Sequence, residues 1–382
     1  MSLDLVTFAV SMDRLDHFSP NCHIAVAVSG GPDSMALCHL LHHWLRNYPQ
    51  TRLTALIVDH GLRPESAWET QITQDRLKKF GINSTVLHWN GDKPATRIQE
   101  RARQARYALL EEWCRHQGVI HLLTAHHFDD QWETVVSRLQ KKSDIIGLRG
   151  ILPISYKPFG RILRPLLSFT KADILAYLDQ QEIEYVLDPS NQNLKYLRVQ
   201  LRHNRQNLEQ HDFSSTHIQQ VIKEAVSLTD SRLQKLAQFV IQYLRIDPLG
   251  YLEIDRQPFM HLEQALQIEL LRHLSHCMAT ASYPLPRHKA LTALEKIQNN
   301  IRSTLAGWYI VPKKNVLIIG RESRHHHKNP MQFGGLMRQD RFILLANSQS
   351  EDREELNLPS YLSADIPSHP NFILKFLRPL LP

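Results

Sequence analysis

The residues best suited to phosphate chemistry form one short glycine-rich segment. Residues 29–34 read Ser-Gly-Gly-Pro-Asp-Ser and lie between a predicted strand and a predicted helix. Glycines let the backbone approach an oxyanion closely, and a helix N-terminus adds N–H groups and partial positive charge. We therefore predict a phosphate site. Its candidate cofactor-binding residues are Ser29, Gly30, Gly31, Pro32, Asp33 and Ser34.

Asp33 distinguishes this segment from the common nucleotide-binding loops. The sequence has no Gly-Lys-Ser or Gly-Lys-Thr, and no G-x-G-x-x-G follows a strand. A carboxylate next to phosphate groups calls for a divalent cation between them. We therefore predict that Mg²⁺ bridges Asp33 and ATP. The alternative is a plain strand-to-helix turn in which a Ser or Asp side chain only caps the helix.

Two further polar segments follow predicted strands. After the strand 53–58, Asp59 and His60 are candidate contacts for the adenosine or the acceptor, although a polar loop with a turn glycine is the alternative. After the strand 119–125, the chain reads His-His-Phe-Asp-Asp-Gln-Trp-Glu-Thr and opens a helix. Here we predict that His126 transfers a proton or contacts phosphate. We predict that Asp130 binds Mg²⁺ or orients an amine for nucleophilic attack.

The candidate catalytic residues are therefore Asp33, His126 and Asp130, and the candidate metal ligands are Asp33 and Asp130. His126 and Asp130 are four residues apart, so they share a helix face if the helix begins early. Helix capping by the acidic residues is the alternative for this segment.

Arginines gather in three places that suit an RNA backbone. They lie in 97–106 ahead of Tyr107, in 161–164, and in 198–202 near Tyr196. Guanidinium groups bind phosphate oxygens, and an aromatic ring can stack on a base. A solvated helix face with paired glutamates is the alternative for the first group. The candidate RNA contacts are Arg97, Arg101, Arg106, Arg164, Arg198 and Arg202.

The scaffold must bring these segments to one edge. Apolar, β-branched runs alternate with helical patterns in the first half of the chain. The runs are 24–28, 53–58, 85–89 and 119–125, and the helical patterns are 35–44, 67–80, 98–113 and 132–139. This order predicts an α/β fold with a doubly wound parallel sheet, which binds ligands at the carboxyl ends of its strands.

The second half of the chain changes character. Helical patterns replace the strands after about residue 207, and the polar segment 212–216 predicts a domain boundary. We expect a catalytic ATP-binding domain over 1–212, a small mainly helical domain over 213–323, and a linker with a short C-terminal domain or tail over 324–382. Within the second domain, 308–311 and 316–319 predict a hairpin.

Composition sets bounds on the protein class. The chain has 382 residues, too many for one ordinary domain, and 42% are hydrophobic. Its net charge of +7 is compatible with a polyanionic partner. No apolar run approaches the roughly 18 residues of a membrane span, and no signal-peptide pattern is present, so we predict a cytoplasmic protein. The four cysteines are scattered, which favours buried core residues over a disulfide framework or a metal cluster.

The pattern S-G-G-x-D-S resembles the pyrophosphate (PP) loop of the N-type ATP pyrophosphatases. Those enzymes cleave ATP between the α and β phosphates and form an adenylate on a carbonyl-type oxygen. In order along the chain, the motifs are similar to those of the tRNA(Ile)-lysidine synthetases over about the first 205 residues. The matching segments are SGGPDS at 29–34, VDHGLR at 58–63, RIQERARQARY at 97–107, TAHHFDDQWET at 124–134, RPLL at 164–167 and DPSN at 188–191.

The resemblance implies an adenine nucleotide alpha hydrolase-like fold and modification of cytidine 34 in the isoleucine tRNA with a CAU anticodon. The C2 oxygen attacks the α-phosphate of ATP, pyrophosphate leaves, and the ε-amine of L-lysine then displaces AMP to give lysidine. It also implies that the 213–323 domain contacts tRNA. A homodimer is a further candidate assembly. Two departures from the family pattern are Lys141-Lys142-Ser143-Asp144 in place of a glycine-containing turn, and Val199 in place of Asn.

Two alternatives stay open. A tRNA 2-thiolation enzyme of the same superfamily works through catalytic cysteine pairs or a metal cluster, and the scattered cysteines supply neither. A non-catalytic, nucleotide-dependent RNA-binding module would keep the fold without the chemistry, but intact Asp33 and the His-His-Phe-Asp-Asp segment argue against it. Pyrophosphate release would separate the enzyme from the binding module.

Overall fold

The chain divides into two compact units. The computed structural model describes residues 2–15, 18, 21–62, 64–91, 96, 98–186, 197–246, 251–278, 285–305 and 307–321. The division falls between Val226 and Ser227, whereas our predicted boundary follows residue 212. The difference arises because the start of α10 (Ser215–Tyr243) packs in the first unit, where Ile218 joins the cluster around Trp132. The predicted tail over 324–382 lies outside the described residues.

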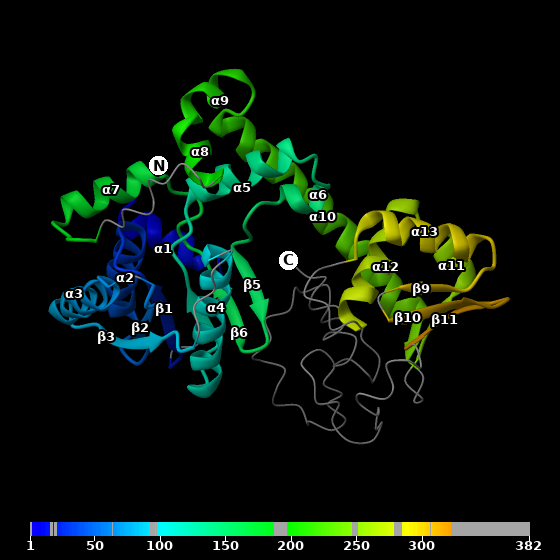
Figure 1. The fold of residues 1–382 in the computed structure, drawn as a ribbon, viewed down its shortest axis with the longest axis horizontal. Helices are drawn as coiled ribbons and strands as arrows, with labels where there is room; N and C mark the ends of the chain where they lie inside the picture. The colour runs from blue at the N-terminus through cyan, green and yellow to red at the C-terminus, as the bar shows by residue number, and fades with distance from the viewer. Residues whose placement is uncertain are drawn as a thin grey trace. The chain divides into compact units, whose positions relative to one another are not determined.

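A six-stranded sheet forms the centre of the first unit (Figure 1). Its order is β3-β2-β1-β4-β6-β5, and all neighbours are parallel except β5, which runs antiparallel to β6 at one edge. The strands are β1 (His23–Val28), β2 (Arg52–Asp59), β3 (Asn83–His88), β4 (His121–Leu123), β5 (Ile154–Lys157) and β6 (Gly160–Leu163). The four predicted strands are confirmed as β1 to β4.

Helices cover both faces of this sheet. Alternate residues of a strand point to opposite faces. Ile24 and Val26 of β1 pack in a cluster with α1, α2, α3 and α7, while Ala25 packs in another cluster with Leu110 and Cys114 of α4. The predicted doubly wound architecture is therefore confirmed. The helices are α1 (Leu5–Asp13), α2 (Pro32–Trp44), α3 (Ser66–Lys79), α4 (Ile98–His116), α5 (Phe128–Gln140), α6 (Ile145–Leu148), α7 (Lys171–Gln180), α8 (Leu197–His203) and α9 (Arg205–His211).

A further cluster joins α5 to α8 and to the start of α10. The indole N–H of Trp132 donates to the backbone oxygen of Phe213 at 2.7 Å, and its ring is fully buried. Leu201 of α8 and Ile218 of α10 pack in the same cluster. This packing fixes α5, the helix that begins with the predicted His-His-Phe-Asp-Asp segment.

The second unit contains a five-stranded antiparallel sheet. The predicted hairpin is confirmed as β10 and β11. Three further strands join this hairpin, and each is only three or four residues long, too short to show alternation in the sequence. Most described residues of the predicted second domain are helical, in α10 to α13, in agreement with our expectation. The order is β7-β8-β11-β10-β9. The elements are β7 (Leu244–Ile246), β8 (Leu252–Asp255), α11 (Arg256–His261), α12 (Gln264–Met278), α13 (Arg287–Gln298), β9 (Ser303–Leu305), β10 (Trp308–Pro312) and β11 (Val316–Arg321).

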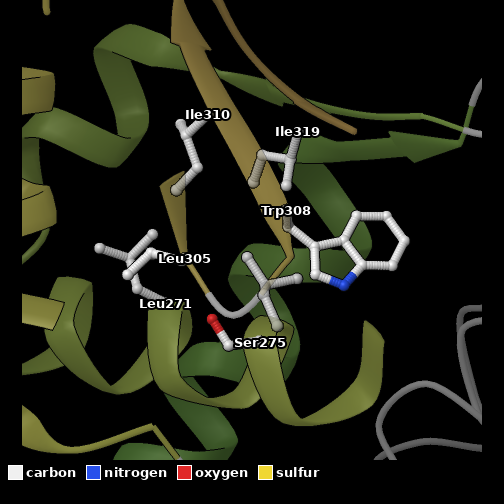
Figure 2. A pocket seen from close by; sticks show the side chains of 7 residues that line it. Leu271, Ser275, Leu305, Trp308, Ile310 and Ile319 are labelled. Atoms are coloured by element: carbon white, nitrogen blue, oxygen red, sulfur yellow. The ribbon is translucent and has the colours of Figure 1, made fainter. Parts of the chain in front are cut away.

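A small pocket of the second unit lies between α12 and the sheet (Figure 2). Ser275 is the one polar residue in its lining, and the others are apolar. Such a lining suits packing of apolar groups and offers little to a charged nucleotide. The lining residues are Leu271, Leu274, Ser275, Leu305, Trp308, Ile310 and Ile319.

Within the part of the chain that the structure describes, no helix combines the length and the apolar character that a bilayer span requires.

Candidate active site

The order of the sheet brings two predicted segments together. Strands β1 and β4 are neighbours, but the chain leaves β1 for β2 on one side, while β4 pairs with β6 on the other. At such a switch point the loops diverge from the carboxyl ends of the strands and leave a crevice for a ligand. The loop 29–34 follows β1 and the segment 124–130 follows β4, so both lie at this point.

The glycine-rich loop has the geometry of a phosphate site. Gly31 is the N-cap of α2, with extended backbone angles of φ −74° and ψ 166°, and Pro32 is the first residue of the helix. The Ser34 hydroxyl donates to the Gly31 carbonyl at 3.0 Å and accepts from the Ser29 N–H at 3.1 Å. Gly30 has φ +77°, which a glycine adopts without strain. The loop is thus closed on itself at the positive end of α2.

Asp33 and Asp130 meet at one imidazole nitrogen. His127 Nε2 lies 3.7 Å from Asp33 Oδ2 and 3.8 Å from Asp130 Oδ2. The other ring nitrogen, Nδ1, accepts the Asp129 N–H at 3.2 Å, which fixes the buried ring. Sequence reasoning assigned a role to His126 and none to His127. The two carboxylates predicted as metal ligands are nevertheless brought together.

Asp33 also has a cationic neighbour that the sequence did not connect to it. The Lys171 ammonium, from the first residue of α7, lies 2.5 Å from Asp33 Oδ1. The two residues are 138 positions apart in the chain. The sequence analysis gave Lys171 no role, because no spacing in the sequence places it at the phosphate loop.

His126 is uncharged in this site. Burial lowers its pKa to about 3, and Arg164 and Arg103 act in the same direction, against the opposing effect of Asp130. Its Nδ1 lies 3.0 Å from the Thr124 hydroxyl. A neutral imidazole can hydrogen-bond to a phosphate oxygen but offers it no charge, and proton transfer at neutral pH would need a bound anion to raise this pKa.

Asp130 is ionised. Burial raises its pKa, but His127, through its ring and its backbone N–H, and Arg198 outweigh burial and hold the pKa below the usual value. That N–H donates to Asp130 Oδ2 at 3.2 Å, and Arg202 Nη2 lies 3.7 Å from Oδ1. The capping alternative is therefore present as well, because the same carboxylate completes a capping box at the start of α5.

Glu133 is a site residue that sequence reasoning left without a role. Its side chain is 1% exposed and carries a two-point contact from Arg202, through Nε to Oε1 and through Nη2 to Oε2 at 3.4 Å. Arg198 Nε lies 3.9 Å from Oε2. Burial raises the pKa of Glu133 although Arg202 opposes this. Arg198 and Arg202, predicted as RNA contacts, thus face a buried carboxylate one helical turn from Asp130.

Asp59 and His60 are held within their own loop. Asp59 Oδ1 accepts the Gly61 N–H at 2.9 Å and the Ser66 hydroxyl, and these bonds hold its pKa below the usual value even though burial raises it. Arg106 Nη2 lies 3.0 Å from His60 Nε2. No contact in the structure tests the predicted binding of RNA by Arg106. The predicted binding of adenosine by Asp59 and His60 also stays a prediction. The contacts explain how the loop after β2 is kept in shape.

The remaining predicted RNA contacts differ in exposure. Arg101 is exposed on α4. Arg164 is buried, and its Nη1 donates to the Leu152 carbonyl at 2.6 Å and to the Ser155 hydroxyl at 2.9 Å. Burial lowers the pKa of this guanidinium. Arg97 and Tyr196 lie outside the described residues, as does the segment 188–191.

The cysteines have the properties of core residues. Burial raises the pKa of the Cys38 and Cys114 thiols to about 12 each, and it also raises the pKa of Cys22. The Cys277 side chain lies outside the described part of the chain. Among the described residues, no group of three or more His, Cys, Asp or Glu side chains is arranged to hold a metal ion.

The fold and the loop define the class of the protein. Residues 6–208 match the family model of the PP-loop domain, so the chain is a PP-loop protein, as the resemblance implied. Its fold is also similar to that of the U34-tRNA thiolase NcsA from Methanococcus maripaludis, with a TM-score of 0.51 and 18% identity over 58% of this chain and 78% of that one. At that identity the likeness concerns the fold alone.

Similar proteins of assigned function indicate which family of PP-loop proteins the chain belongs to. The chain is 35% identical to the tRNA(Ile)-lysidine synthase of Wolbachia pipientis wMel over 80% of this chain and 72% of that protein. It is 32% identical to the tRNA(Ile)-lysidine synthase of Orientia tsutsugamushi (strain Boryong) over 83% of this chain and 74% of that protein. The chain belongs to the tRNA(Ile)-lysidine synthase family.

Proposed function

We propose that this protein is an ATP-dependent ligase that joins L-lysine to C2 of cytidine 34 in the isoleucine tRNA with a CAU anticodon. One observation supports this most directly: Asp33 of the phosphate loop and Asp130 of α5 both lie within 4 Å of His127 Nε2 at the switch point of the sheet. These distances support a site for ATP phosphates next to a site for an attacking amine. ATP, tRNA and free lysine meet in the cytoplasm, where we place the reaction.

The carboxylate pair fits a Mg²⁺ ion. Magnesium in phosphoryl-transfer sites is bound through one or two carboxylates together with waters and phosphate oxygens, not through a full protein cage. Asp33 and Asp130 would hold it, and both belong to the segments that face the crevice. When bound, the ion supplies charge neutralisation at the phosphate oxygens.

Adenylation requires the phosphate loop to bind pyrophosphate, the leaving group. The C2 oxygen of cytosine attacks the α-phosphorus, an oxygen–phosphorus bond forms, and the bond to pyrophosphate breaks. We assign the stabilisation of the developing negative charge to the backbone N–H groups at the start of α2 and to the Ser29 hydroxyl. Neutral His126, one strand away, can donate a further hydrogen bond to a phosphate oxygen.

Attack by lysine requires an unprotonated amine that is oriented toward C2. The nitrogen forms a bond to C2, the bond from C2 to the AMP oxygen breaks, and the amine loses a proton. Because the pKa of Asp130 is held below its usual value, this carboxylate is better suited to orient the amine than to keep its proton. Glu133, a turn further along α5 with a raised pKa, is the better proton acceptor.

A thiolation reaction would need a reactive sulfur nucleophile, and the thiolate is the reactive form of cysteine. Burial raises the pKa of Cys38 and Cys114 to about 12, so both thiols stay protonated at neutral pH. We therefore place lysine ligation ahead of 2-thiolation.

The test is incorporation of labelled lysine into RNA. The protein is incubated with ATP, Mg²⁺, radiolabelled L-lysine and a CAU-anticodon isoleucine tRNA transcript, with a methionine tRNA transcript and the Asp33→Ala variant as controls. We expect label in the isoleucine tRNA alone and loss of at least a hundredfold in rate with Asp33→Ala. AMP and pyrophosphate release without lysine incorporation would point to another nucleophile. The absence of ATP turnover with any RNA would contradict the enzyme and favour a binding module.

A further inference from the structure

Helices α2 and α7 are joined by two polar contacts that have the same offset in the sequence. At the edge of the site, Lys171 contacts Asp33. Deeper in the fold, His39 Nδ1 lies 2.8 Å from the Tyr177 hydroxyl. The partners are 138 positions apart in both pairs, so each helix has the same length, about 9 Å, between its two contacts. The helices therefore run side by side in the same direction and in one register.

The contact between His39 and Tyr177 is buried and uncharged. The two residues are 8% and 3% exposed. Burial lowers the pKa of His39 to about 4, with His43 and His42 acting in the same direction, and burial raises the pKa of Tyr177 to about 12. Both groups are therefore neutral at pH 7. Removal of one partner alone would leave a polar atom without its hydrogen bond in the core.

Apolar packing accompanies this hydrogen bond between the two helices. Leu37, Leu40 and Leu41 of α2 belong to the same hydrophobic cluster as Ile174 and Leu178 of α7. The hydrophobic effect is non-directional, so these side chains hold the helices together but tolerate a small slide along the axis. A hydrogen bond is directional and short, and a slide of one residue, about 1.5 Å, would break it. The register therefore depends on the polar pair.

The register of α7 determines which groups reach the phosphate loop. At the first residue of the helix, the Lys171 ammonium lies 2.5 Å from Asp33 Oδ1. Beyond its end, the Val186 N–H donates to the Gly30 carbonyl at 2.8 Å. A slide of α7 would change both contacts with the loop. His39 takes part in neither of them, so it acts on the loop through the position of α7.

We propose that His39 and Tyr177 are positioning residues for the phosphate loop, because their hydrogen bond fixes the register of α7 against α2. This inference rests on the proposed use of ATP by the loop, and on neither cytidine nor lysine as a substrate. It predicts that ATP binding depends on the hydrogen bond and not on the stability of the fold. Substitutions at the two positions separate these quantities.

The test uses the full chain without tRNA. The ligand is the ATP analogue with a methylene bridge between its α and β phosphates, titrated with Mg²⁺ in a calorimeter, and the urea midpoint measures stability. Tyr177→Phe removes one partner, so we expect a lower midpoint and a Kd raised about threefold to tenfold. His39→Leu combined with Tyr177→Phe removes both partners. In this double variant the midpoint should return toward the wild-type value while the Kd stays raised.

His39→Asn should have the opposite effect. Its side-chain amide can take the place of imidazole Nδ1 and keep the bond to Tyr177, but it loses the ring contact with Phe80, whose centroid lies 5.2 Å from that of His39. We expect a lower midpoint and a Kd within about twofold of wild type. Tyr48→Phe is the matched control, since it removes a tyrosine hydroxyl beside Trp44 and should change neither value.

A Kd that recovers together with the midpoint in the double variant, or a Kd that none of the variants changes, would overturn the inference. A crystal structure of the double variant is an independent readout. We expect α7 to be displaced along α2, and an unchanged register would also overturn the inference. If the wild type binds no ATP analogue, the proposed function fails, and the register in that crystal structure still decides the role of the pair.

Discussion

Thr73 of α3 occupies the space in front of Gly30 in the phosphate loop. A Cβ atom on Gly30 would overlap the Thr73 hydroxyl oxygen, which itself donates to the Glu69 carbonyl at 2.7 Å. The φ of +77° at Gly30 is a second obstacle to a side chain. The loop conformation therefore depends on a helix that contributes nothing to its sequence motif.

Gly30→Ala should destabilise the protein by about 2 kcal/mol and weaken ATP binding, because both the overlap and the backbone strain must be relieved by moving the loop. Urea unfolding and nucleotide titration measure the two effects. Adding Thr73→Ala leaves only the Cβ of residue 73, 3.5 Å from the new methyl group. The double variant should regain part of the loss. If it is no better than Gly30→Ala, the overlap with Thr73 is not the cause.

Arg202 and Arg198 should differ in their importance for stability. Arg202→Met leaves the buried Glu133 without its two-point partner and should cost about 2 kcal/mol in the free energy of unfolding, since an uncompensated buried charge is expensive. Arg198 is 49% exposed and 3.9 Å from the same carboxylate, so Arg198→Met should cost less than about 0.5 kcal/mol. Urea unfolding of both variants measures the difference, and equal losses would contradict the geometry.

Acid should destabilise the protein through His39. Burial lowers the pKa of His39 to about 4, with His43 and His42 acting in the same direction, and its Nδ1 lies 2.8 Å from the Tyr177 hydroxyl. An unfolded histidine has a pKa of about 6.5, so between pH 6.5 and pH 4 the unfolded chain binds the additional proton. The stability that neutral His39 contributes is complete above pH 6.5 and falls as the pH drops to 4.

His39→Gln should therefore flatten the fall in unfolding free energy between pH 6.5 and pH 4 by about 1–2 kcal/mol. Urea unfolding at several pH values gives this slope. His116→Gln, at an exposed position of α4, serves as the control. A slope that His39→Gln leaves unchanged would assign the acid sensitivity to other groups.

Glu182→Gly should stabilise the protein by up to about 1 kcal/mol. Glu182 ends α7 with φ 50°, its N–H donates to the Asp179 carbonyl, and the Ile183 N–H donates to the Leu178 carbonyl. Helices commonly end in this conformation at a glycine, and the Cβ of Glu182 strains the backbone at this positive φ. A rise in the urea midpoint for Glu182→Gly is expected, and Glu182→Ala should show none. A gain with alanine would show that the side chain, not the backbone, is the liability.

The central sheet could be predicted because its strands carry long local patterns. The run 24–28 is apolar and bounded by a glycine turn, and it is confirmed as β1. The hairpin of β5 and β6 was missed because each strand has four residues and Pro158 stands between them, which is typical of a break rather than of strands. In the second unit, three strands of the sheet were likewise not predicted because each has only three or four residues.

The candidate site divides in the same way. Ser29 to Ser34 are contiguous, so their chemistry could be recognised before any fold was known. Lys171 reaches Asp33 only because α7 packs beside α2, and no spacing in the sequence expresses that contact. His127 and His126 are adjacent and chemically identical, so their different positions toward Asp33 depend on the turn at the start of α5. Residue type indicates what a group can do, and packing decides which group does it.

The antiparallel strand β5 has a consequence for the behaviour of the protein among other chains. A sheet edge offers unpaired backbone groups to any extended segment nearby. Here the edge next to β6 is covered by four residues that end in Lys157, whose ammonium lies 3.6 Å from Glu111, and Pro158 follows directly. A charged and interrupted strand is a poor template for further strands. This edge of the sheet is therefore a poor site for pairing with extended segments of other chains.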